Sequence, residues 1–540
     1  MTERRLAIAL LLLPLLVALL LLLTTTSQPD QDATATTSRT DAASTTPIPH
    51  RRHATARLAA TPPPVATTVV RALTPPPPSQ RPRRLLVTYR AEAQRRALVQ
   101  ALQAHGLGDI LTHAGLPVLA VAGDHRAIRQ LLQDFPGVHW ELDQPLVRPD
   151  VSAPRTIGDG APFLHQLLPW LGIDASTPGR GQGVTIAVLD EPITATASIA
   201  NASLNQLDLF GLDTGAQTTG HGNAIASIIA ADSSALQGIA PEATILSIPV
   251  LDPDGNGSIF TLAAAISAAA EQGASIISLS LGTTSPSALL QTVIDQAAAN
   301  GIVIIAAAGN HGSETPFYPA ACANVISVAA CDANGNPTDF SNYGSHIDLA
   351  APGLDLAADI GDADGLVAFS GTSAAAPCVA ATLAALLADN PDLTPEAAAA
   401  ILLAKAIDGA SPGRDPQTGD GILNYTTAAN WDNPSYTDAA VAGFHLDLDQ
   451  DDGSDTPLIC SAQNLGNTTL PTLTLTANAN GQTVTQTFTN VLPGQTVSTS
   501  IPIPNDQRDA ISATTHLDVP NTSEHSLLNN TKTVTIKLQP

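Results

Sequence analysis

Residues 184–190 read Val-Thr-Ile-Ala-Val-Leu-Asp, a nearly continuous apolar run that ends in a carboxylate. Such a run is typical of a strand that is buried on both faces, as in the parallel sheets of α/β domains. Similar runs follow at 243–250, 275–281 and 302–307, and Ala-rich stretches of helical length separate them, such as 262–272 and 287–300. Apolar strands that alternate with helices predict a three-layer α/β domain with a mostly parallel sheet.

Polar residues stand where these elements end or begin. Asp190 ends the first run, at the carboxyl edge where open α/β sheets bind ligands. His221 lies between two glycines at the start of an Ala- and Ile-rich stretch, and Ser373 opens another after a Gly-Thr pair. Asn310 follows the strand at 302–307. Taken singly, these are ordinary turn, surface and N-cap residues. A serine at a helix N-terminus, however, has its own free N–H beside it.

Taken together, in the order Asp, His, Asn, Ser, these positions resemble the subtilisin family over about residues 165–425. The matching stretches are Ile186-Ala187-Val188-Leu189-Asp190, His221-Gly222, Ser280-Leu281-Gly282, Ala307-Ala308-Gly309-Asn310 and Gly371-Thr372-Ser373-x-Ala375-x-Pro377. The resemblance implies a serine endopeptidase with Ser373 as the nucleophile and His221 as the general base and then acid. It also implies that Asp190 orients the imidazole. Asn310 and the Ser373 amide would form the oxyanion hole.

The same resemblance assigns the binding of substrate, which would be an extended protein or peptide segment cleaved with broad preference. The residues expected to bind it are Gly255, Gly257, Ser280, Leu281, Gly282, Ala307 and Gly309. Glycines at such positions allow close approach of another backbone. No cofactor is required for this chemistry. The family often binds structural calcium, for which the sequence indicates no ligand set.

The residues after Asp190 depart from the family pattern. Glu191 and Pro192 stand where the family usually has Ser or Thr and then Gly, and Asn223 replaces the usual Thr after His-Gly. Pro192 has a fixed φ and no N–H, and Glu191 adds a negative charge. A catalytically inactive subtilase that acts as an exported binding protein is therefore the alternative function.

Two further alternatives concern the acidic residue and the family. Asp213, eight residues before His221, is a second candidate for the orienting acid. The sedolisin family shares a Gly-Thr-Ser-x-x-x-Pro segment, but it lacks the His and has Asp where this chain has Asn310. Both positions favour the subtilisin family.

Residues 85–150 predict a small α+β domain of βαββαβ order before the peptidase domain at 151–430. Its strands are expected at 85–89, 109–112, 116–121 and 138–142, and its helices at 91–105 and 125–134. This order resembles the inhibitory propeptide of subtilisins. The resemblance implies a domain that assists folding, blocks the cleft in cis and is cut near residues 148–160. A permanent accessory domain is the alternative.

Residues 431–540 predict a β-sandwich, because polar and apolar residues alternate at 470–477, 483–489, 496–503 and 531–537. The region resembles the Ig-like adhesion-type modules of bacterial exported proteins. Such a module can bind a ligand or only stabilise its neighbour, and the sequence leaves both interpretations open.

The N-terminal part carries the features of an export signal. Arg4 and Arg5 precede an uncharged apolar run at 6–23, within a predicted signal peptide or anchor at 1–24. The run of 18 residues reaches the lower limit of a membrane span, so both a cleaved signal and a retained tether are compatible with it. The Thr- and Pro-rich residues 25–84 predict a disordered linker. We therefore expect a secreted, periplasmic or cell-envelope protein.

The charge distribution and the number of cysteines exclude further classes of protein. Residues 1–150 carry 16 Lys and Arg against 11 Asp and Glu, whereas residues 151–540 carry 7 against 37. So acidic a body argues against nucleic-acid binding and favours a soluble monomer. The four cysteines are too few for a disulfide scaffold, and their three full pairings cannot be distinguished from sequence.

Overall fold

The computed structural model describes residues 83–148, 163–212, 219–252, 254–361, 365–448, 455–504, 507, 510–520, 522–526 and 529–536. The predicted export signal, residues 25–82 of the predicted linker, Asp213 and the expected cleavage region after residue 148 lie outside these residues. Arg84, the last residue of the predicted linker, is the first residue of a strand.

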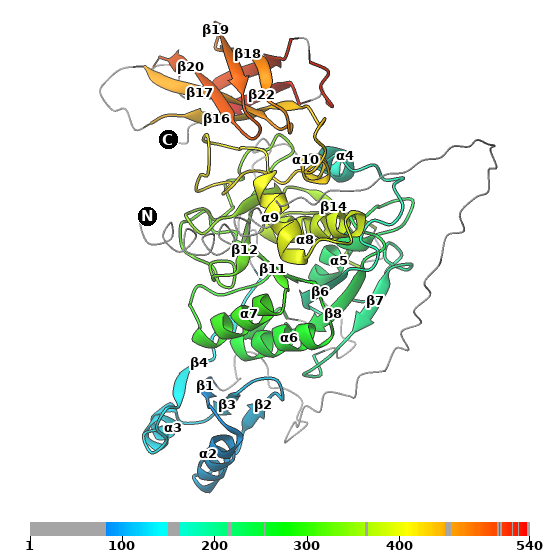
Figure 1. The fold of residues 1–540 in the computed structure, drawn as a ribbon. Helices are drawn as coiled ribbons and strands as arrows, with labels where there is room; N and C mark the ends of the chain where they lie inside the picture. The colour runs from blue at the N-terminus through cyan, green and yellow to red at the C-terminus, as the bar shows by residue number, and fades with distance from the viewer. Residues whose placement is uncertain are drawn as a thin grey trace, which may run out of the picture. The chain divides into compact units, whose positions relative to one another are not determined.

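The described residues form a central sheet of seven strands, in which all neighbouring strands are parallel (Figure 1). From edge to edge the strands are β13 (Leu349–Pro352), β12 (Val325–Cys331), β11 (Val303–Ala307), β10 (Ile276–Leu279), β6 (Thr185–Asp190), β8 (Thr244–Pro249) and β7 (Ser203–Gln206). The predicted α/β class with a mostly parallel sheet is therefore confirmed.

Helices cover both faces of this sheet, which explains why its strands are apolar without alternation (Figure 1). Ile186 and Val188 of β6 belong to the cluster that holds α5 (His221–Ala230), α8 (Thr372–Asp389) and α9 (Pro395–Ala404). Ala187 and Leu189 belong to the cluster on the other face, with α6 (Ile259–Glu271) and α7 (Ala288–Ala299). The helix α8 is long and apolar enough to cross a membrane, yet it is the buried core helix of this domain.

Shorter elements complete the α/β domain. They are α4 (Leu167–Leu171), the two-residue strand β9 (Gly257–Ser258), the antiparallel pair β14 (Leu356–Ala358) and β15 (Val367–Phe369), and α10 (Tyr425–Ala429). The strand β15 ends shortly before α8 begins, so it leads the chain into the Gly-Thr-Ser segment.

The N-terminal domain has the order β1, α2, β2, β3, α3, β4. Its elements are β1 (Arg84–Thr88), α2 (Glu92–Ala104), β2 (Ile110–Thr112), β3 (Val118–Ala122), α3 (His125–Leu132) and β4 (His139–Leu142). The antiparallel sheet has the order β2-β3-β1-β4. Leu85 and Val87 face α2 and α3, whereas Leu86 joins the cluster that includes α6 and α7. The two central strands, β1 and β3, are thus buried on both faces, whereas the edge strand β4 is mostly exposed.

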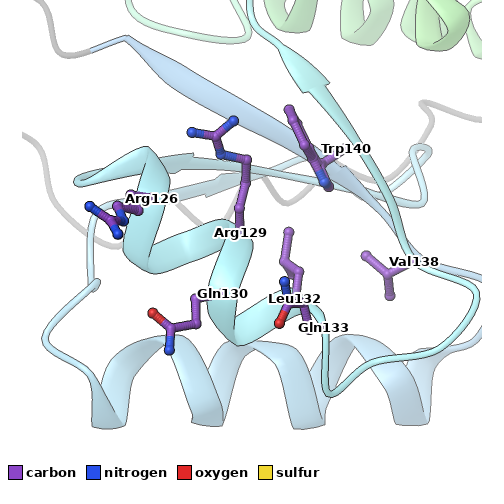
Figure 2. Close-up of a pocket in the computed structure, with 7 residues that line it drawn as sticks. All are labelled: Arg126, Arg129, Gln130, Leu132, Gln133, Val138 and Trp140. Atoms are coloured by element: carbon purple, nitrogen blue, oxygen red, sulfur yellow. The ribbon is translucent and has the colours of Figure 1, made fainter.

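An open hollow of about 700 Å³ lies beside α3 in this domain (Figure 2). It is lined by Arg126, Arg129, Gln130, Leu132, Gln133, Val138 and Trp140. The Arg129 guanidinium stacks over the Trp140 ring at 5.2 Å from its centroid. None of the site residues expected from the sequence lines this hollow.

The described part of residues 439–536 forms two antiparallel sheets that share apolar clusters. One sheet contains β16 (Ala439–Leu446), β17 (Thr456–Asn464) and β20 (Thr496–Ile503), and the other contains β18 (Leu470–Ala479), β19 (Gln482–Val491), β21 (Ile511–Asp518) and β22 (Thr531–Ile536). Val441 of the first sheet and Leu475 of the second belong to one cluster, so the sheets pack face to face.

All four cysteines lie within the described residues and are free thiols. Cys331, Cys378 and Cys460 are buried and behave as small apolar side chains of the core.

Candidate active site

The carboxylate of Asp190 and the imidazole of His221 are joined by a hydrogen bond. Asp190 is the last residue of β6 and His221 the first of α5, and His221 Nδ1 lies 2.8 Å from Asp190 Oδ1. The backbone N–H of Glu191 donates to the same oxygen at 2.8 Å. The unusual Glu191-Pro192 corner therefore supplies a backbone donor to the Asp190 carboxylate and leaves its contact with His221 intact.

Close packing fixes the position of the imidazole. A Cβ atom on Gly222 would lie 2.6 Å from the carbonyl oxygen of Glu191, so the backbone after His221 can approach this loop only as glycine. On another side, the Phe369 ring packs edge-on against the His221 ring with 5.4 Å between centroids. Phe369 belongs to β15, just before the Gly-Thr-Ser segment.

Ser373 is the second residue of α8 and is almost completely buried. Gly371 is the N-cap of this helix and has a φ of 127°, a conformation that favours glycine. Within the described residues, Ser373 Oγ has no hydrogen-bond partner. The carbonyl of Ser373 accepts a 3.1 Å hydrogen bond from Ser280 Oγ, which joins the start of α8 to the loop after β10. In the first helical turn, the backbone N–H of Ser373 has no intrahelical acceptor and can serve a ligand.

Asn310 lies three residues after β11, and its amide oxygen is turned toward α8. Asn310 Oδ1 accepts hydrogen bonds from the N–H and from Oγ1 of Thr372, each at 2.9 Å. Thr372 Oγ1 also accepts the N–H of Gly309 at 3.1 Å. With the oxygen held in this way, the NH₂ end of the Asn310 amide points away from Thr372. The sequence assigned no role to Thr372, although it stands directly before Ser373 in the recognised motif.

An extended segment of the N-terminal part lies between two of the expected substrate-binding segments. The strand β5 (Pro145–Leu146) pairs antiparallel with β9, so that Leu146 lies opposite Gly257. Val147 exchanges both backbone hydrogen bonds with Gly282, at 2.8 and 2.9 Å. Leu146 is buried in the same cluster as Leu281. The residues expected to bind an extended peptide thus hold residues 145–147 of this chain.

The remaining expected substrate-binding residues differ in what they contact. Gly255 lies beneath Arg148, because a Cβ atom there would be 2.8 Å from Arg148 Nε. Ala307 is buried in the core on the α5 and α8 face of the sheet, and Gly309 contacts Thr372.

The carboxylate of Glu191 has a cationic partner that the sequence did not indicate. Arg148 Nη1 lies 3.0 Å from Glu191 Oε1 and also contacts Thr219 Oγ1. The Thr219 hydroxyl is 2.9 Å from each carboxylate oxygen of Glu191, and the Thr219 N–H donates to Oε2 at 3.2 Å. Burial, and next the adjacent charge of Asp190, raise the pKa of Glu191. No local pattern connects Glu191 with a residue 43 positions earlier.

Within the described residues, no group of three or more His, Cys, Asp or Glu side chains is arranged to hold a metal ion. The structure therefore indicates no ligands for the expected structural calcium in the described part of the chain.

Comparison with known proteins identifies the family of the α/β domain. The sequence model of the subtilase family, Peptidase_S8, matches residues 181–428. Thermitase of Thermoactinomyces vulgaris is 40% identical over 216 residues, which are 39% of this chain and 77% of thermitase. Subtilisin BL of Lederbergia lenta is 35% identical over 213 residues, 39% of this chain and 78% of that protein. The solved structure of the prenylagaramide maturation protease PagA aligns at 30% identity with a TM-score of 0.42, over 47% of this chain and 98% of that one.

Proposed function

The chain belongs to the subtilase family and is a serine-type endopeptidase, and we propose that Ser373, His221 and Asp190 form its catalytic triad. The observation that carries this proposal is the 2.8 Å hydrogen bond between Asp190 and His221. Its support is the placement of His221 and Ser373 in the first turns of α5 and α8, two helices that pack against each other.

In the proposed mechanism, Ser373 Oγ attacks the carbonyl carbon of the scissile peptide bond while His221 Nε2 takes its proton. Asp190 accepts the Nδ1–H of His221 and stabilises the imidazolium that forms. The tetrahedral intermediate then collapses, the C–N bond breaks and His221 protonates the leaving amine. Water, deprotonated by His221, hydrolyses the resulting acyl-enzyme and restores Ser373.

The negative charge that develops on the carbonyl oxygen requires donors placed in advance. We assign this role to the Ser373 backbone N–H and to Asn310 Nδ2. The hydrogen bonds from Thr372 to Asn310 Oδ1 support the assignment, because they hold the amide in one of its two orientations. The positive end of the α8 dipole favours the same charge.

Residues 85–150, which the structure describes up to residue 148, are proposed to be an inhibitory propeptide. The segment 145–147 pairs with Gly257 and Gly282 in the way an extended substrate would. The Glu141 carboxylate accepts the N–H groups of Ala288 and Leu289 at 2.9 and 3.2 Å, at the start of α7. Asp143 Oδ1 accepts the Phe260 N–H at the start of α6 at 3.0 Å. These contacts join residues 141–143 to the first turns of α7 and α6, which suits a domain that docks on its neighbour.

The C-terminal sheets and the N-terminal residues 6–23 also have proposed roles. The C-terminal sheets are proposed to form an Ig-like module with a stabilising role. Asp408 of the α/β domain supports this role, since its N–H donates to Gln463 at 2.8 Å and its carboxylate accepts from Thr496 at 2.5 Å. We place the protein outside the cytoplasm, either secreted or tethered to the cell envelope through residues 6–23, as a monomer that acts on protein and peptide substrates.

Expression of residues 28–540 as wild type and as Ser373→Ala tests the proposal, with precursor mass and casein hydrolysis followed together. We expect only the wild type to shorten near residue 150 and to hydrolyse casein. If neither protein hydrolyses casein or shortens, the inactive binding protein becomes the better description. If Ser373→Ala is as active as the wild type, the assignment of the nucleophile is wrong.

A further inference from the structure

We propose that Glu191 and Thr219 form a binding site for the guanidinium of a substrate arginine, two residues before the cleaved bond. This inference rests on the proposed function, whose cleft it describes in more detail. The subtilase pattern usually has Ser or Thr at the position of Glu191, so the acidic side chain there departs from that pattern.

The strand register gives the position of the arginine relative to the cleaved bond. Val147 pairs antiparallel with Gly282, and Arg148 is the next residue of the extended segment. In an antiparallel pair, each step forward on one strand is a step backward on the other. In a substrate bound with this register, the residue after the arginine therefore lies opposite Ser280. Because Ser280 Oγ contacts the carbonyl of Ser373, that residue would present the carbonyl that Ser373 attacks.

Burial of Glu191 supplies the reason for selecting a cation. The side chain of Glu191 is 0% exposed and lies next to the Asp190 carboxylate in the chain. A buried carboxylate is costly unless a positive charge and hydrogen bonds compensate it. Thr219 provides hydrogen bonds but no charge, and Arg148 provides the charge at 3.0 Å. Departure of residues 145–148 from the cleft would remove this cation, and a substrate arginine would restore it.

The surroundings leave room for a long planar group. Gly255 lies against the Nε edge of Arg148, and a Cβ atom there would come within 2.8 Å of that nitrogen. The Arg148 side chain is itself 18% exposed, so the site opens to solvent on one side and a substrate can enter it. Nη1 alone reaches both the Glu191 carboxylate and the Thr219 hydroxyl, so one end of the guanidinium makes a charge-assisted contact with the pair.

The test uses internally quenched peptides of the sequence Pro-Leu-Val-Xaa-Leu-Ser, in which Xaa is arginine or its neutral isostere citrulline. The full-length chain is first incubated until its mass is constant, and kcat/KM is then measured for both peptides. We expect the kcat/KM of the wild type to be roughly 10- to 100-fold higher for the arginine peptide, because a hydrogen bond to a charged group contributes a free energy of this size. Glu191→Gln should bring the ratio to about one by lowering only the arginine value.

Glu396→Gln is the matched control, because it removes a carboxylate from the exposed first turn of α9. It should keep the wild-type ratio. If the wild type cleaves both peptides at equal rates and Ser373→Ala cleaves neither, the arginine site is wrong. The peptidase assignment is then still supported. Hydrolysis of neither peptide, nor of casein, would instead overturn the proposed function. If Glu191→Gln is inactive on both peptides, the wild-type ratio decides, because it needs no variant to fold: a ratio of about one overturns the arginine site, and a preference for arginine supports it.

Discussion

Thr372 Oγ1 donates a 2.9 Å hydrogen bond to Asn310 Oδ1, across 62 positions of the sequence. The same hydroxyl oxygen accepts the Gly309 N–H at 3.1 Å. The residue directly before the proposed nucleophile thus holds the oxygen end of the Asn310 amide toward the start of α8. The proposed oxyanion hole depends on this contact between the loop after β11 and the first turn of α8.

Thr372→Val tests whether this hydroxyl positions Asn310. Valine keeps the shape of threonine but leaves the Gly309 N–H without its acceptor and Asn310 Oδ1 with one donor fewer. We expect kcat on a peptide substrate to fall roughly 10- to 100-fold with little change in KM, since a lost buried hydrogen bond costs about 1–3 kcal/mol. Thr372→Ser, which restores the hydroxyl, should recover most of the activity. A rise in KM with unchanged kcat would contradict the positioning role.

Asn310→Ala removes the proposed side-chain donor to the oxyanion. Loss of one such donor lowers kcat by about 10²–10³-fold, a scale set by mutagenesis in a member of this family. We expect the change in kcat, measured on the same peptide, with nearly unchanged KM, because the donor acts on charge that appears only in the transition state. Wild-type kcat in the variant would show that another group binds the oxyanion.

Asp143→Asn tests the docking of the N-terminal domain and its dependence on pH. Burial raises the pKa of Asp143 from 3.8 to about 6, so the docked state binds this proton more tightly than an undocked chain does. The stabilisation is complete below pH 3.8 and is lost as the pH rises through 6. In a Ser373→Ala background, Asp143→Asn should therefore raise the free energy of unfolding at pH 7 by up to about 3 kcal/mol, measured by urea titration. It should have little effect at pH 4.

The other titrating groups affect the stability of Asp143→Asn and of its parent equally, so the difference between the two proteins at each pH reports on Asp143 alone. An equal effect at pH 4 and pH 7 would mean that the Asp143 proton does not contribute to docking.

Glu141→Ala removes the carboxylate that caps α7. Because Glu141 accepts the N–H groups of Ala288 and Leu289, its loss should weaken docking by about 1–2 kcal/mol, in the range of helix caps. In the Ser373→Ala precursor, limited proteolysis should then remove the N-terminal domain faster. Glu92→Ala is the control, since Glu92 is exposed and pairs only with Arg95 of its own helix among the described residues. Equal proteolysis rates for both variants would contradict the capping role.

Local pattern predicted much of the fold. The strand expected at 302–307 is β11 at Val303–Ala307, and the helix expected at 287–300 is α7 at Ala288–Ala299. These elements can be predicted because an apolar run or a helical periodicity lies within consecutive residues. The edge strand β7 (Ser203–Gln206) was not expected, since its Ser-Leu-Asn-Gln sequence carries no apolar run. Its hydrogen bonds to β8 place it in the sheet.

The sequence by itself determined the α/β class, the family resemblance and the positions of Asp190, His221, Asn310 and Ser373 at element ends. Each of these follows from short motifs or from periodicity within one element. Only the tertiary structure decided what surrounds them: Thr372 beside Asn310, and Arg148 beside Glu191. Such pairs depend on the register and direction of strands and helices that are far apart in the chain. For this reason the Glu191 carboxylate, a mere irregularity in the sequence, has a partner and a proposed role only in the folded molecule.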